Sequence, residues 1–380
     1  MQQYTIIHTT CHTQWGGLEK RILNESLWMR DRGHNITIIA PHNTPLITKA
    51  KAHNLKVYGL QFTWSSFFTV TRSLKIIFKT DKPDIVNTHG NEDSKIVLLT
   101  AKQTEIPLKI LSRHISAPVK NSWYNEILYR RLCHQIFTTS HFTKKQLQET
   151  FQLENDKVSS MPSGIIPPES LLEKEEAKYR VQSELNIDQS LEGLIGFVGR
   201  VSDDKGIPVL FEACAHIKDA IAGYHLVIVG GGDNEYIDYL KKLACNYGMR
   251  SWVHFVGLKE NVWDYYRAFD MCILPSQEFN ERPFEGVPQT LLESMHCSCP
   301  VVASNTGGIR DIVLPGKTGR LFEYDQPEML GQAIREVINN PATTKNYVEN
   351  AKQMVDQQYT MDVMGQKISD IYDRYLKKQV

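Results

Sequence analysis

Residues 194–206, with the sequence LIGFVGRVSDDKG, give the clearest indication of the fold of this chain. The run LIGFV is short and apolar, and a loop that carries two glycines and two basic residues follows it directly. Short strands of this kind alternate with helices in parallel α/β sheets, where ligands bind in the loops beyond the carboxyl ends of the strands. Residues 194–206 therefore predict a strand with a candidate ligand-binding loop at its end.

Similar runs alternate with helix-like segments along the rest of the chain, in two sets. The first set is Tyr4–His8, Asn35–Ala40, Lys56–Leu60, Ile85–Thr88, Leu108–Ser112 and Ile136–Thr139. The second set is Leu194–Val198, His225–Val229, Val253–Val256, Met271–Leu274, Val301–Ala303 and Arg320–Phe322. A length of 380 residues, 41% of them hydrophobic and 23% charged, suits two soluble domains. We therefore expect an α/β protein with two doubly wound parallel sheets.

The break between the two sets contains the paired prolines Pro167 and Pro168, which stop regular structure. We place the hinge within residues 165–191, and we expect one domain over residues 1–168 and a second over residues 169–360. The last segment, about residues 361–380, carries apolar residues in one helical stripe. It either caps the second domain or crosses back to the first.

The composition argues against several classes of protein. No apolar run approaches the roughly 18 residues that a membrane span needs, and the first residues lack the pattern of a secretory leader, so the cytoplasm is the expected compartment. The seven cysteines are odd in number and scattered, which argues against a disulfide framework. Cys297 and Cys299 stand too close for a zinc knuckle and have no second pair, so we expect no metal site.

The formal net charge of zero conceals an asymmetry between the two halves. Residues 1–170 hold 21 Lys and Arg against 13 Asp and Glu, a balance of +8, which leaves −8 for the remainder. A basic half suits an anionic substrate or an anionic membrane surface, and an ordinary solvated face is the alternative. No nucleic-acid-binding motif accompanies it, so we expect no nucleic acid as a partner.

Three glycine-containing loops follow predicted strands. The pair Gly16–Gly17 opens a helix, where free N–H groups favour an anion, although a tight turn has the same composition. Arg200 supplies a planar guanidinium group and Lys205 a compact ammonium group, and this combination suits a diphosphate. Residues 230–232 are GGG, but Glu235 stands where a dinucleotide fingerprint needs its third glycine, which excludes an NAD site of that type.

The most specific segment is FEGVPQTLLE at residues 284–293. Pro288 suits the first position of a helix, so the free N–H groups of the next two residues would face a phosphate. Side chains on a helix lean toward its amino end, so Glu293 can point back at the same ligand while Glu285 reaches it from the preceding loop. Two carboxylates would repel a diphosphate, so they suit the hydroxyls of a sugar. A surface loop before a solvated helix is the alternative.

An ordered set of motifs runs along the whole chain. It consists of GG-x-E at 16–19, VGR-x4-KG at 198–206, VGGG at 229–232, F-x-G at 255–257, E-x7-E at 285–293, PVVAS-x-x-GG at 300–308 and G-x-x-G at 316–319. In this order, and with the E-x7-E spacing, the chain resembles family 4 of the retaining glycosyltransferases from end to end. The resemblance implies the GT-B fold, in which two Rossmann-like domains face each other across a cleft that binds a nucleoside-diphosphate sugar.

The resemblance also implies roles for the matching residues. Arg200 and Lys205 would grip the diphosphate, so that no metal ion or other cofactor is needed. Glu285 would hold the transferred sugar, Glu293 the ribose, and Leu258 would lie beside the nucleobase. The remaining donor-binding residues would be Gly16, Gly17, Gly199, Gly230, Pro288, Gln289 and Thr290.

The reacting centre is less well defined by the resemblance. His114 matches a histidine that lies beside the sugar and the acceptor in several members, and His89 competes with it for this role. Residues 277–284, QEFNERPF, are longer and more charged than the family pattern, which makes Glu278 and Glu281 alternatives to Glu285, although the spacing favours Glu285. A second departure is Asp311, which stands where the family usually has a glutamate.

These observations together predict a metal-independent, retaining hexosyltransferase. It would move a sugar from a UDP- or GDP-sugar to a hydroxyl of a glycan or lipid-linked acceptor, in the synthesis of cell-surface polysaccharide or lipopolysaccharide. Same-face attack is expected, with the leaving diphosphate as the base. The alternatives are a nucleotide-sugar epimerase of similar fold, a nucleotide-sugar-binding protein without turnover, and a glycoside hydrolase, whose mechanism has no use for Arg200 and Lys205.

Two aromatic and basic stretches lie in the basic half. They contain Trp64, Phe67, Phe68, Lys75 and Lys79, and Lys120, Trp123, Tyr124, Arg130 and Arg131. Such stretches suit docking on anionic lipid, although packing inside a core is the alternative. The sequence thus predicts a peripheral protein on the inner face of the cytoplasmic membrane, with an acceptor-binding first domain and a nucleotide-sugar-binding second domain.

Overall fold

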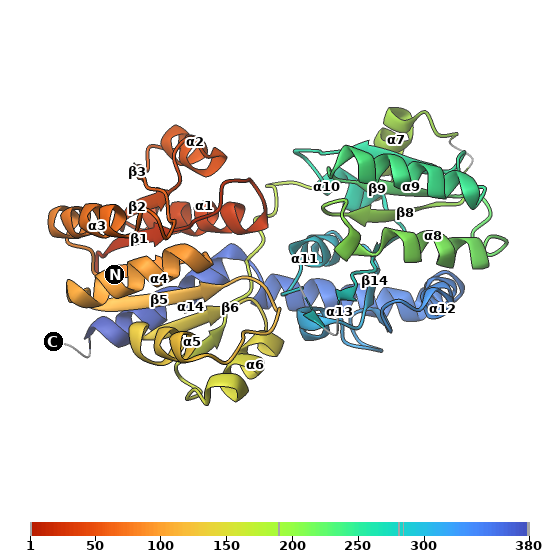
Figure 1. The fold of residues 1–380 in the computed structure, drawn as a ribbon. Coiled ribbons are helices and arrows are strands. Elements are labelled where there is room, and N and C mark those ends of the chain that lie inside the picture. Colours follow the sequence, from red (N-terminus) through yellow and green to blue (C-terminus); the bar gives the residue numbers. More distant parts are fainter. Residues whose placement is uncertain (1, 189–190, 280–281, 284, 378–380) are drawn as a thin grey trace. The chain divides into compact units, whose positions relative to one another are not determined.

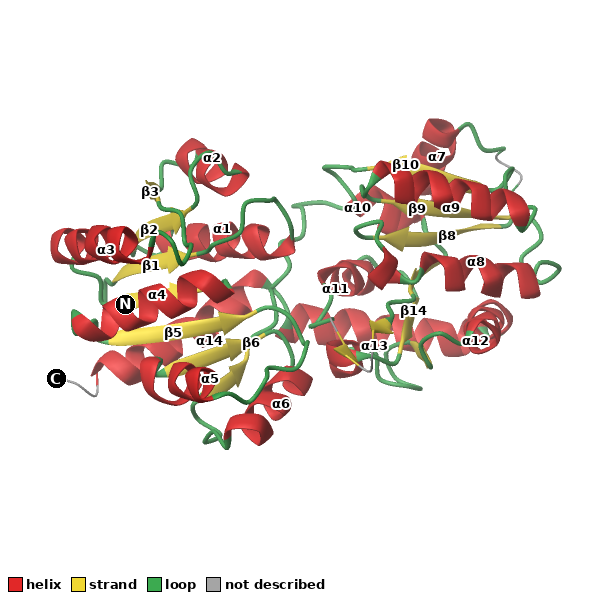
Figure 2. Cartoon of the chain, viewed as in Figure 1, coloured by secondary structure: helices red, strands yellow, loops and turns green. Residues whose placement is uncertain are grey.

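The structure is a computed structural model that describes residues 2–188, 191–279, 282–283 and 285–377. It divides into two compact units, one made of residues 1–164 and 360–380 and the other of residues 165–359. Each unit contains a parallel sheet with helices packed on both faces (Figures 1 and 2).

In the described part of the first unit, seven strands form one parallel sheet in the order β3-β2-β1-β4-β5-β6-β7. The strands are β1 (Thr5–Thr9), β2 (Asn35–Ala40), β3 (Lys56–Gly59), β4 (Ile85–Thr88), β5 (Leu108–Arg113), β6 (Gln135–Thr138) and β7 (Val158–Ser160). The helices are α1 (Gly17–Arg30), α2 (Pro45–Ala52), α3 (Phe67–Asp81), α4 (Asn91–Gln103), α5 (Trp123–Ile127), α6 (His141–Phe151) and α14 (Met361–Leu376). The strand order reverses between β1 and β4, which is where open α/β sheets bind ligands.

The last helix, α14, belongs to the first unit. Its apolar stripe packs against α1, so that Ile368 and Tyr372 are buried in the same core cluster as Trp28. Trp28 Nε1 also donates a hydrogen bond to Asp362 Oδ1 at 2.7 Å. The chain therefore completes the core of the first unit with its carboxyl-terminal segment.

Within the described residues of the second unit, the main sheet has six parallel strands in the order β10-β9-β8-β11-β14-β15. They are β8 (Gly193–Val198), β9 (Tyr224–Val229), β10 (Val253–Gly257), β11 (Met271–Leu274), β14 (Val301–Ser304) and β15 (Arg320–Phe322). The helices are α7 (Lys174–Leu185), α8 (Ile207–His216), α9 (Asn234–Asn246), α10 (Trp263–Ala268), α11 (Gln289–His296), α12 (Pro327–Asn339) and α13 (Pro341–Gln358). Here the strand order reverses between β8 and β11.

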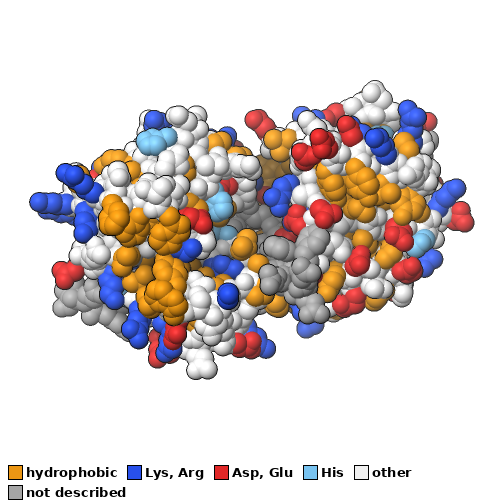
Figure 3. Space-filling model, viewed as in Figure 1, with side chains coloured by type: hydrophobic (Ala, Val, Ile, Leu, Met, Phe, Trp, Pro, Cys, Tyr) orange, Lys and Arg blue, Asp and Glu red, His pale blue; other side chains and the backbone are white. Residues whose placement is uncertain are grey.

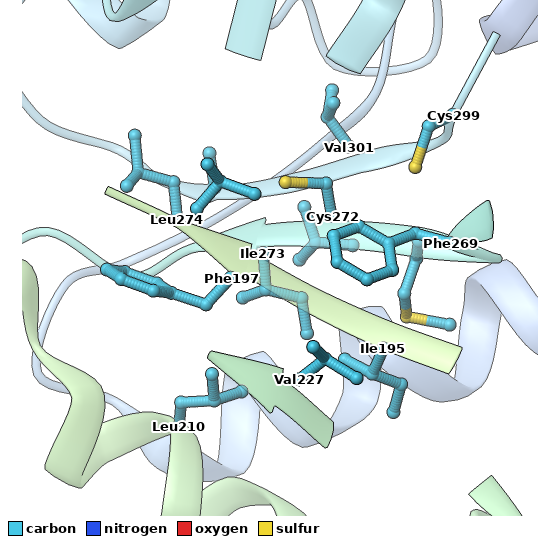
Figure 4. Packing of buried hydrophobic residues seen from close by; sticks show 14 of the residues in the cluster. Ile195, Phe197, Leu210, Val227, Phe269, Cys272, Ile273, Leu274, Cys299 and Val301 are labelled. Carbon is cyan, nitrogen blue, oxygen red and sulfur yellow. The ribbon is translucent and has the colours of Figure 1, made fainter. Parts of the chain in front are cut away.

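The core of the second unit lies on both faces of this sheet. Figure 4 shows side chains of β8, among them Ile195 and Phe197, packed with Cys272 and Ile273 of β11. These residues are almost fully buried, because neighbouring strands of a parallel sheet are covered by helices on both sides. The rigid sheet holds the loops at its carboxyl edge in fixed positions.

The architecture confirms the predicted fold class, and each predicted apolar run contains a strand. The sequence did not predict β7, or the small antiparallel pair β12 (Glu278–Phe279) and β13 (Arg282–Pro283). β7 was missed because it is short and two of its three residues are serine. The division between the units falls after Gly164 and again after Tyr359, whereas the sequence suggested residues 168 and 360.

Candidate active site

The loops after β8 and β9 run side by side at the carboxyl edge of the second sheet. The Gly199 N–H donates to Val229 O at 3.0 Å, and the Val201 N–H donates to Gly231 O at 2.8 Å. Gly230 has a φ of +146°, and a Cβ atom there would lie 1.8 Å from Gly199 O. The two turns thus approach each other more closely than side chains allow, which explains the glycines after both strands.

The loop after β8 also presses on the loop after β11, at the point where the strand order reverses. Gly206 has a φ of +66°, and a Cβ atom there would lie 2.0 Å from Pro275 O. The backbone N–H of Gln277 donates to Asp204 O at 2.9 Å. This close contact brings Lys205, next to Gly206, into the same site as residues of the β11–α11 connection.

Lys205 is a largely buried cation between two carboxylates. Its Nζ forms an ion pair with Glu285 and another with Asp204 Oδ2, at 3.3 Å. Burial alone lowers the pKa of Lys205, but the charges of Glu285 and Asp204 outweigh this effect and raise the pKa above its usual value. Lys205 is therefore charged at neutral pH.

Arg200 lies on the open side of the same cluster. Its side chain is 69% exposed, and Nη2 lies 3.4 Å from both carboxylate oxygens of Asp204. Burial acts to raise the pKa of Asp204, but the charge of Lys205, the Ser202 hydroxyl and the charge of Arg200 together lower it. Asp204 is thus an ionised anchor for both cations, and most of the Arg200 guanidinium faces solvent.

Glu285 connects this cluster to the segment before α11. Besides the ion pair with Lys205, its Oε1 accepts a hydrogen bond from Ser276 Oγ at 2.7 Å. Its backbone carbonyl accepts a hydrogen bond from the Gly308 N–H at 2.9 Å, in the loop after β14. Loops from β8, β11 and β14 therefore meet at Glu285.

Helix α11 begins one residue later than the sequence predicted. Gln289 is its first residue, and Pro288 is the N-cap with extended backbone, φ −72° and ψ 125°. The prediction that Pro288 occupies the first helical position was wrong, because the proline ring fixes φ alone and fits both positions. Gln289 and Thr290 are the first two residues of α11, so their N–H groups still lie in the first turn, at the positive end of the helix dipole.

Glu293 projects from α11 into the interior of the second unit. Its side chain is nearly buried, and Oε2 accepts a hydrogen bond from the hydroxyl of Tyr266 at 3.1 Å. Burial raises the pKa of the fully buried Tyr266 hydroxyl well above its usual value, and the charge of Glu293 adds to this effect. Tyr266 therefore keeps its proton and holds the Glu293 carboxylate in place. Sequence reasoning missed this residue, because a tyrosine in α10 carries no motif.

The alternatives to Glu285 lie differently. Glu278 Oε1 accepts a hydrogen bond from the buried Thr306 hydroxyl at 2.5 Å, so this carboxylate is engaged with the loop after β14. Glu281 lies outside the described residues. Leu258 is 83% exposed in the loop after β10, and its Cβ lies 3.7 Å from the position of a Cβ built on Gly231. Of the residues the sequence selected, Glu285 alone is ion-paired with Lys205 in the described structure.

In the first unit, the predicted glycine pair begins α1. Gly16 is the N-cap, with no side-chain hydrogen bond to the helix end, and Gly17 is the first helical residue. A Cβ atom built on Gly17 would meet nothing within 4 Å, so the space beside it is open. Arg200 and Lys205 belong to the second unit, and Gly16 and Gly17 to the first.

Three histidines form a continuous chain at the carboxyl edge of the first sheet. His8 Nδ1 lies 2.9 Å from His89 Nε2, and His89 Nδ1 lies 2.9 Å from His114 Nε2. The structure thus brings together His89 and His114, which the sequence had treated as competitors. Sequence reasoning missed His8. It lies one residue before the end of β1, and His89 and His114 each come directly after the end of a strand, so all three are near the same edge of the sheet.

The two aromatic and basic stretches of the first unit lie beside each other. Lys95 Nζ lies 5.9 Å from the ring centroid of Trp64 and 5.7 Å from that of Tyr124, within the range of cation–π contacts. The exposed fractions are 62% for Trp64, 86% for Phe68 and 75% for Trp123. Figure 3 shows apolar and basic side chains on this face of the first unit, around α4 and α5.

The described residues contain no group of three or more His, Cys, Asp and Glu side chains that could hold a metal ion. None of the helices in the described part of the chain has the length and apolar character that crossing a membrane requires.

The two α/β units and the loops at the carboxyl edges of their sheets identify the class of protein. The chain has the GT-B fold of nucleotide-sugar-dependent glycosyltransferases. Residues 15–167 match the sequence model of the family Glycosyltransferase Family 4, and residues 183–354 match that of Glycosyl transferases group 1. The chain belongs to this family and is a glycosyltransferase.

Three similar proteins illustrate the relationship. An uncharacterized glycosyltransferase of Methanocaldococcus jannaschii is 28% identical over 243 residues, which cover 63% of this chain and 59% of the relative. The lipopolysaccharide core biosynthesis mannosyltransferase LpcC of Rhizobium leguminosarum is 26% identical over 48% of this chain and 51% of the relative. The crystal structure of Anabaena HepE in complex with UDP-glucose has a TM-score of 0.77 and 16% identity, and the similarity covers 97% of this chain and 98% of HepE.

Proposed function

We propose that this glycosyltransferase is a retaining enzyme that moves a hexose from a UDP- or GDP-sugar to a hydroxyl of a glycan or lipid-linked acceptor. The observation that carries the proposal is the ion cluster of Arg200, Lys205, Asp204 and Glu285 at the point where the strand order of the second sheet reverses. It combines cations for a diphosphate with a carboxylate for a sugar hydroxyl.

The diphosphate of the donor would bind to the two cations. Arg200 is largely exposed and is held near the site by Asp204, while Lys205 is charged and lies deeper. The first turn of α11 adds the N–H groups of Gln289 and Thr290 and the partial positive charge of a helix start. HepE, whose structure holds UDP-glucose, supports a nucleoside-diphosphate sugar as the donor class.

The sugar and the nucleoside would be held by the two glutamates. Glu285 would release Lys205 to the diphosphate and accept hydrogen bonds from hydroxyls of the transferred hexose. Glu293, oriented by Tyr266, would accept hydrogen bonds from the ribose, and the exposed Leu258 would lie against the nucleobase. Gly199 and Gly230, and Gly16 and Gly17 at the start of α1, would leave room for the backbone to approach the donor.

In this proposal the leaving diphosphate is the base of the reaction. The acceptor hydroxyl attacks the anomeric carbon on the face from which the diphosphate departs, and a phosphate oxygen takes the hydroxyl proton. Arg200, Lys205 and the α11 start stabilise the charge that develops on the leaving group, and electrostatic stabilisation of this kind is worth about 10²–10³ in rate for one donor. This chemistry needs no metal ion.

The first unit would bind the acceptor. The exposed Trp64, Phe68 and Trp123, next to Lys95, form a surface of the kind that docks on anionic lipid headgroups. Docking on the inner face of the cytoplasmic membrane would bring the enzyme to a lipid-linked acceptor. The similarity to LpcC favours a place in lipopolysaccharide or cell-surface polysaccharide synthesis.

Release of nucleoside diphosphate tests the transferase itself. We expect UDP or GDP to raise the melting temperature, because a ligand that binds only the folded state stabilises it. The matching nucleotide sugars should then release nucleoside diphosphate only when a glycan or lipid-linked acceptor is present. Turnover without release would indicate an epimerase, binding without turnover a binding protein, and cleavage of glycans without nucleotide a hydrolase.

Vesicle co-sedimentation tests the docking surface. The double variant Trp64→Ser/Trp123→Ser should lose binding to vesicles that contain anionic lipid, and binding of the wild type should fade as salt rises. Tyr179→Ser, which removes an exposed aromatic side chain from the second unit, is the matched control and should bind like the wild type. Absence of wild-type binding at low salt would contradict the proposal.

A further inference from the structure

The three histidines of the first unit lie in or directly after three adjacent strands, near the carboxyl edge of the sheet. His8 lies in β1 with no exposed surface, His89 follows β4 and is 3% exposed, and His114 follows β5 and is half-buried. The order of these strands in the sheet is β1, β4, β5. The histidine chain therefore begins in the core at His8 and ends at His114, and the strand order reverses between the strands of His8 and His89.

At neutral pH each ring in this histidine chain carries one proton, because burial lowers the pKa of His8, His89 and His114 below the usual value. Other charges act on the rings as well. Arg21 lowers all three pKa values, His12 and Arg113 lower that of His114, and Glu25 opposes the shift at His8. The chain is thus made of three neutral imidazoles.

Three neutral rings joined by two hydrogen bonds permit only two proton arrangements. Each contact joins Nδ1 of one ring to Nε2 of the next, and each needs a single donor. In the first arrangement every ring is protonated at Nδ1 and donates toward His114, which leaves a lone pair on His8 Nε2. In the second, every ring is protonated at Nε2 and donates toward His8, whose own Nε2–H then points into the core.

The buried end of the chain distinguishes the two arrangements. His8 Nε2 has no hydrogen-bond partner among the described residues. A buried N–H without an acceptor is rarer in proteins than a buried acceptor without a donor, which favours the first arrangement. Arg21 and Glu25 form an ion pair at 3.7 Å in the same core, and neither makes a hydrogen bond to His8 Nε2.

We propose that His8 and His89 are positioning residues that fix His114 as the tautomer protonated at Nδ1. The inference rests on the proposed function and assigns a task to that ring: Nδ1–H of His114 donates a hydrogen bond to an oxygen of the bound sugar. Nδ1 of His114 makes no hydrogen bond within the described part of the chain, so it is available for this contact. Because this nitrogen already holds its proton, His114 is not the base that takes the acceptor proton.

Nuclear magnetic resonance on protein with ¹³C- and ¹⁵N-labelled histidine reads the tautomer without any substrate. Long-range correlations from the ring protons distinguish a neutral ring protonated at Nδ1 from one protonated at Nε2, and His114→Gln identifies the signal of His114. We expect His114 protonated at Nδ1 in the wild type. A wild-type His114 protonated at Nε2 would overturn the inference.

Two substitutions at His89 separate positioning from packing. The amide nitrogen of asparagine lies close to where histidine has Nδ1, so His89→Asn can still donate to His114 Nε2, whereas His89→Leu cannot. We expect His89→Leu to release His114 into a mixture of tautomers and to lower kcat about threefold to tenfold, the effect of one hydrogen bond between neutral groups. His89→Asn should restore most of both. A purely structural role predicts the reverse, because leucine fills a buried site better than asparagine.

The second unit supplies a matched control. His225 Nδ1 and His254 Nε2 lie 2.8 Å apart in the same geometry, near the amino ends of β9 and β10. His254→Leu removes an equal contact far along the strands from the carboxyl edge, and it should leave transfer unchanged. If His89→Asn is no more active than His89→Leu while both melt normally, the inference is wrong. If the wild type transfers no sugar, the proposed function fails, whereas the spectra still decide the tautomer.

Discussion

The carboxyl edges of the two sheets carry opposite chemistry on the same framework. The edge of the first unit ends in neutral imidazoles joined to one another, and that of the second unit in the ion pairs Arg200–Asp204, Lys205–Asp204 and Lys205–Glu285. Neutral donors hydrogen-bond hydroxyls without attracting anions, whereas paired ions exchange partners when a diphosphate arrives. On the proposed function, the first unit contributes neutral contacts to hydroxyls, and the second unit binds the charged leaving group together with the sugar contact of Glu285.

The ionic edge yields the largest predicted effect. Arg200→Met removes the exposed cation that would stabilise the leaving diphosphate, so turnover should fall about 10²- to 10³-fold. The melting temperature should change little, because the side chain is mostly solvated. Arg250→Met, an exposed arginine before β10, is the matched control and should retain full turnover. Steady-state rates that are equal for all three proteins would remove Arg200 from the mechanism.

The histidines make the first unit the more sensitive of the two to acid. Burial lowers the pKa of His8, His34, His89, His114 and His134 in the described part of the first unit, and of His225 and His254 in that of the second. A lowered pKa contributes stability above the unfolded value near 6.5, and this stability is lost as pH falls below it. Each ring costs at most about 1.4 kcal/mol per pH unit.

One carboxyl group in the first unit acts in the opposite direction. Burial raises the pKa of Asp93 to about 6, so this group gains stability as pH falls through that value. The histidines still outnumber it, and we expect the first unit to open first between pH 6.5 and 5. Hydrogen exchange followed by mass spectrometry measures each unit separately. Equal loss of protection in both units over this range would contradict the comparison.

The two glutamates should differ in which ligand they hold. Glu285→Gln should weaken binding of the intact nucleotide sugar, because it removes a contact to the transferred sugar. It should not weaken binding of free nucleoside diphosphate, because that ligand lacks this sugar and the substitution removes a carboxylate that competes for Lys205. Glu293→Gln should weaken both ligands about tenfold or more, as expected when a hydrogen bond to a charged group is lost. Isothermal titration with both ligands decides the matter. Equal loss of nucleotide affinity in the two variants would show that the assigned roles are wrong.

The sequence predicted most of the fold because the strands are apolar and the helices between them regular. It could not predict β7, whose VSS sequence has a single apolar residue, or the pairing of β12 with β13. The cations and glutamates of the site carried recognisable motifs. Their partners did not. Tyr266 meets Glu293 only after α10 and α11 have packed, Ser276 meets Glu285 only through the fold of the connection between β11 and α11, and His8 is one residue among many in an apolar strand.

Tyr266 offers the smallest effect and the most direct test of how the second unit holds its carboxylates. Its hydroxyl donates to Glu293 Oε2 at 3.1 Å from a fully buried ring, so Tyr266→Phe removes one hydrogen bond and leaves the packing in place. We expect nucleoside diphosphate to bind about threefold to tenfold more weakly, with the melting temperature nearly unchanged, because Glu293 loses the group that orients it.

The first unit provides the matched substitution for this test. Tyr372 is equally buried, but its hydroxyl has no hydrogen-bond partner among the described residues. Tyr372→Phe therefore removes the same atom without removing such a contact, and nucleotide affinity should remain that of the wild type. If both variants bind nucleotide like the wild type, Glu293 is not held for ribose by Tyr266. If both variants bind nucleotide weakly, the loss comes from a general change in the cores rather than from the Tyr266–Glu293 hydrogen bond. The result would then no longer support the contrast between the neutral first unit and the ionic second unit.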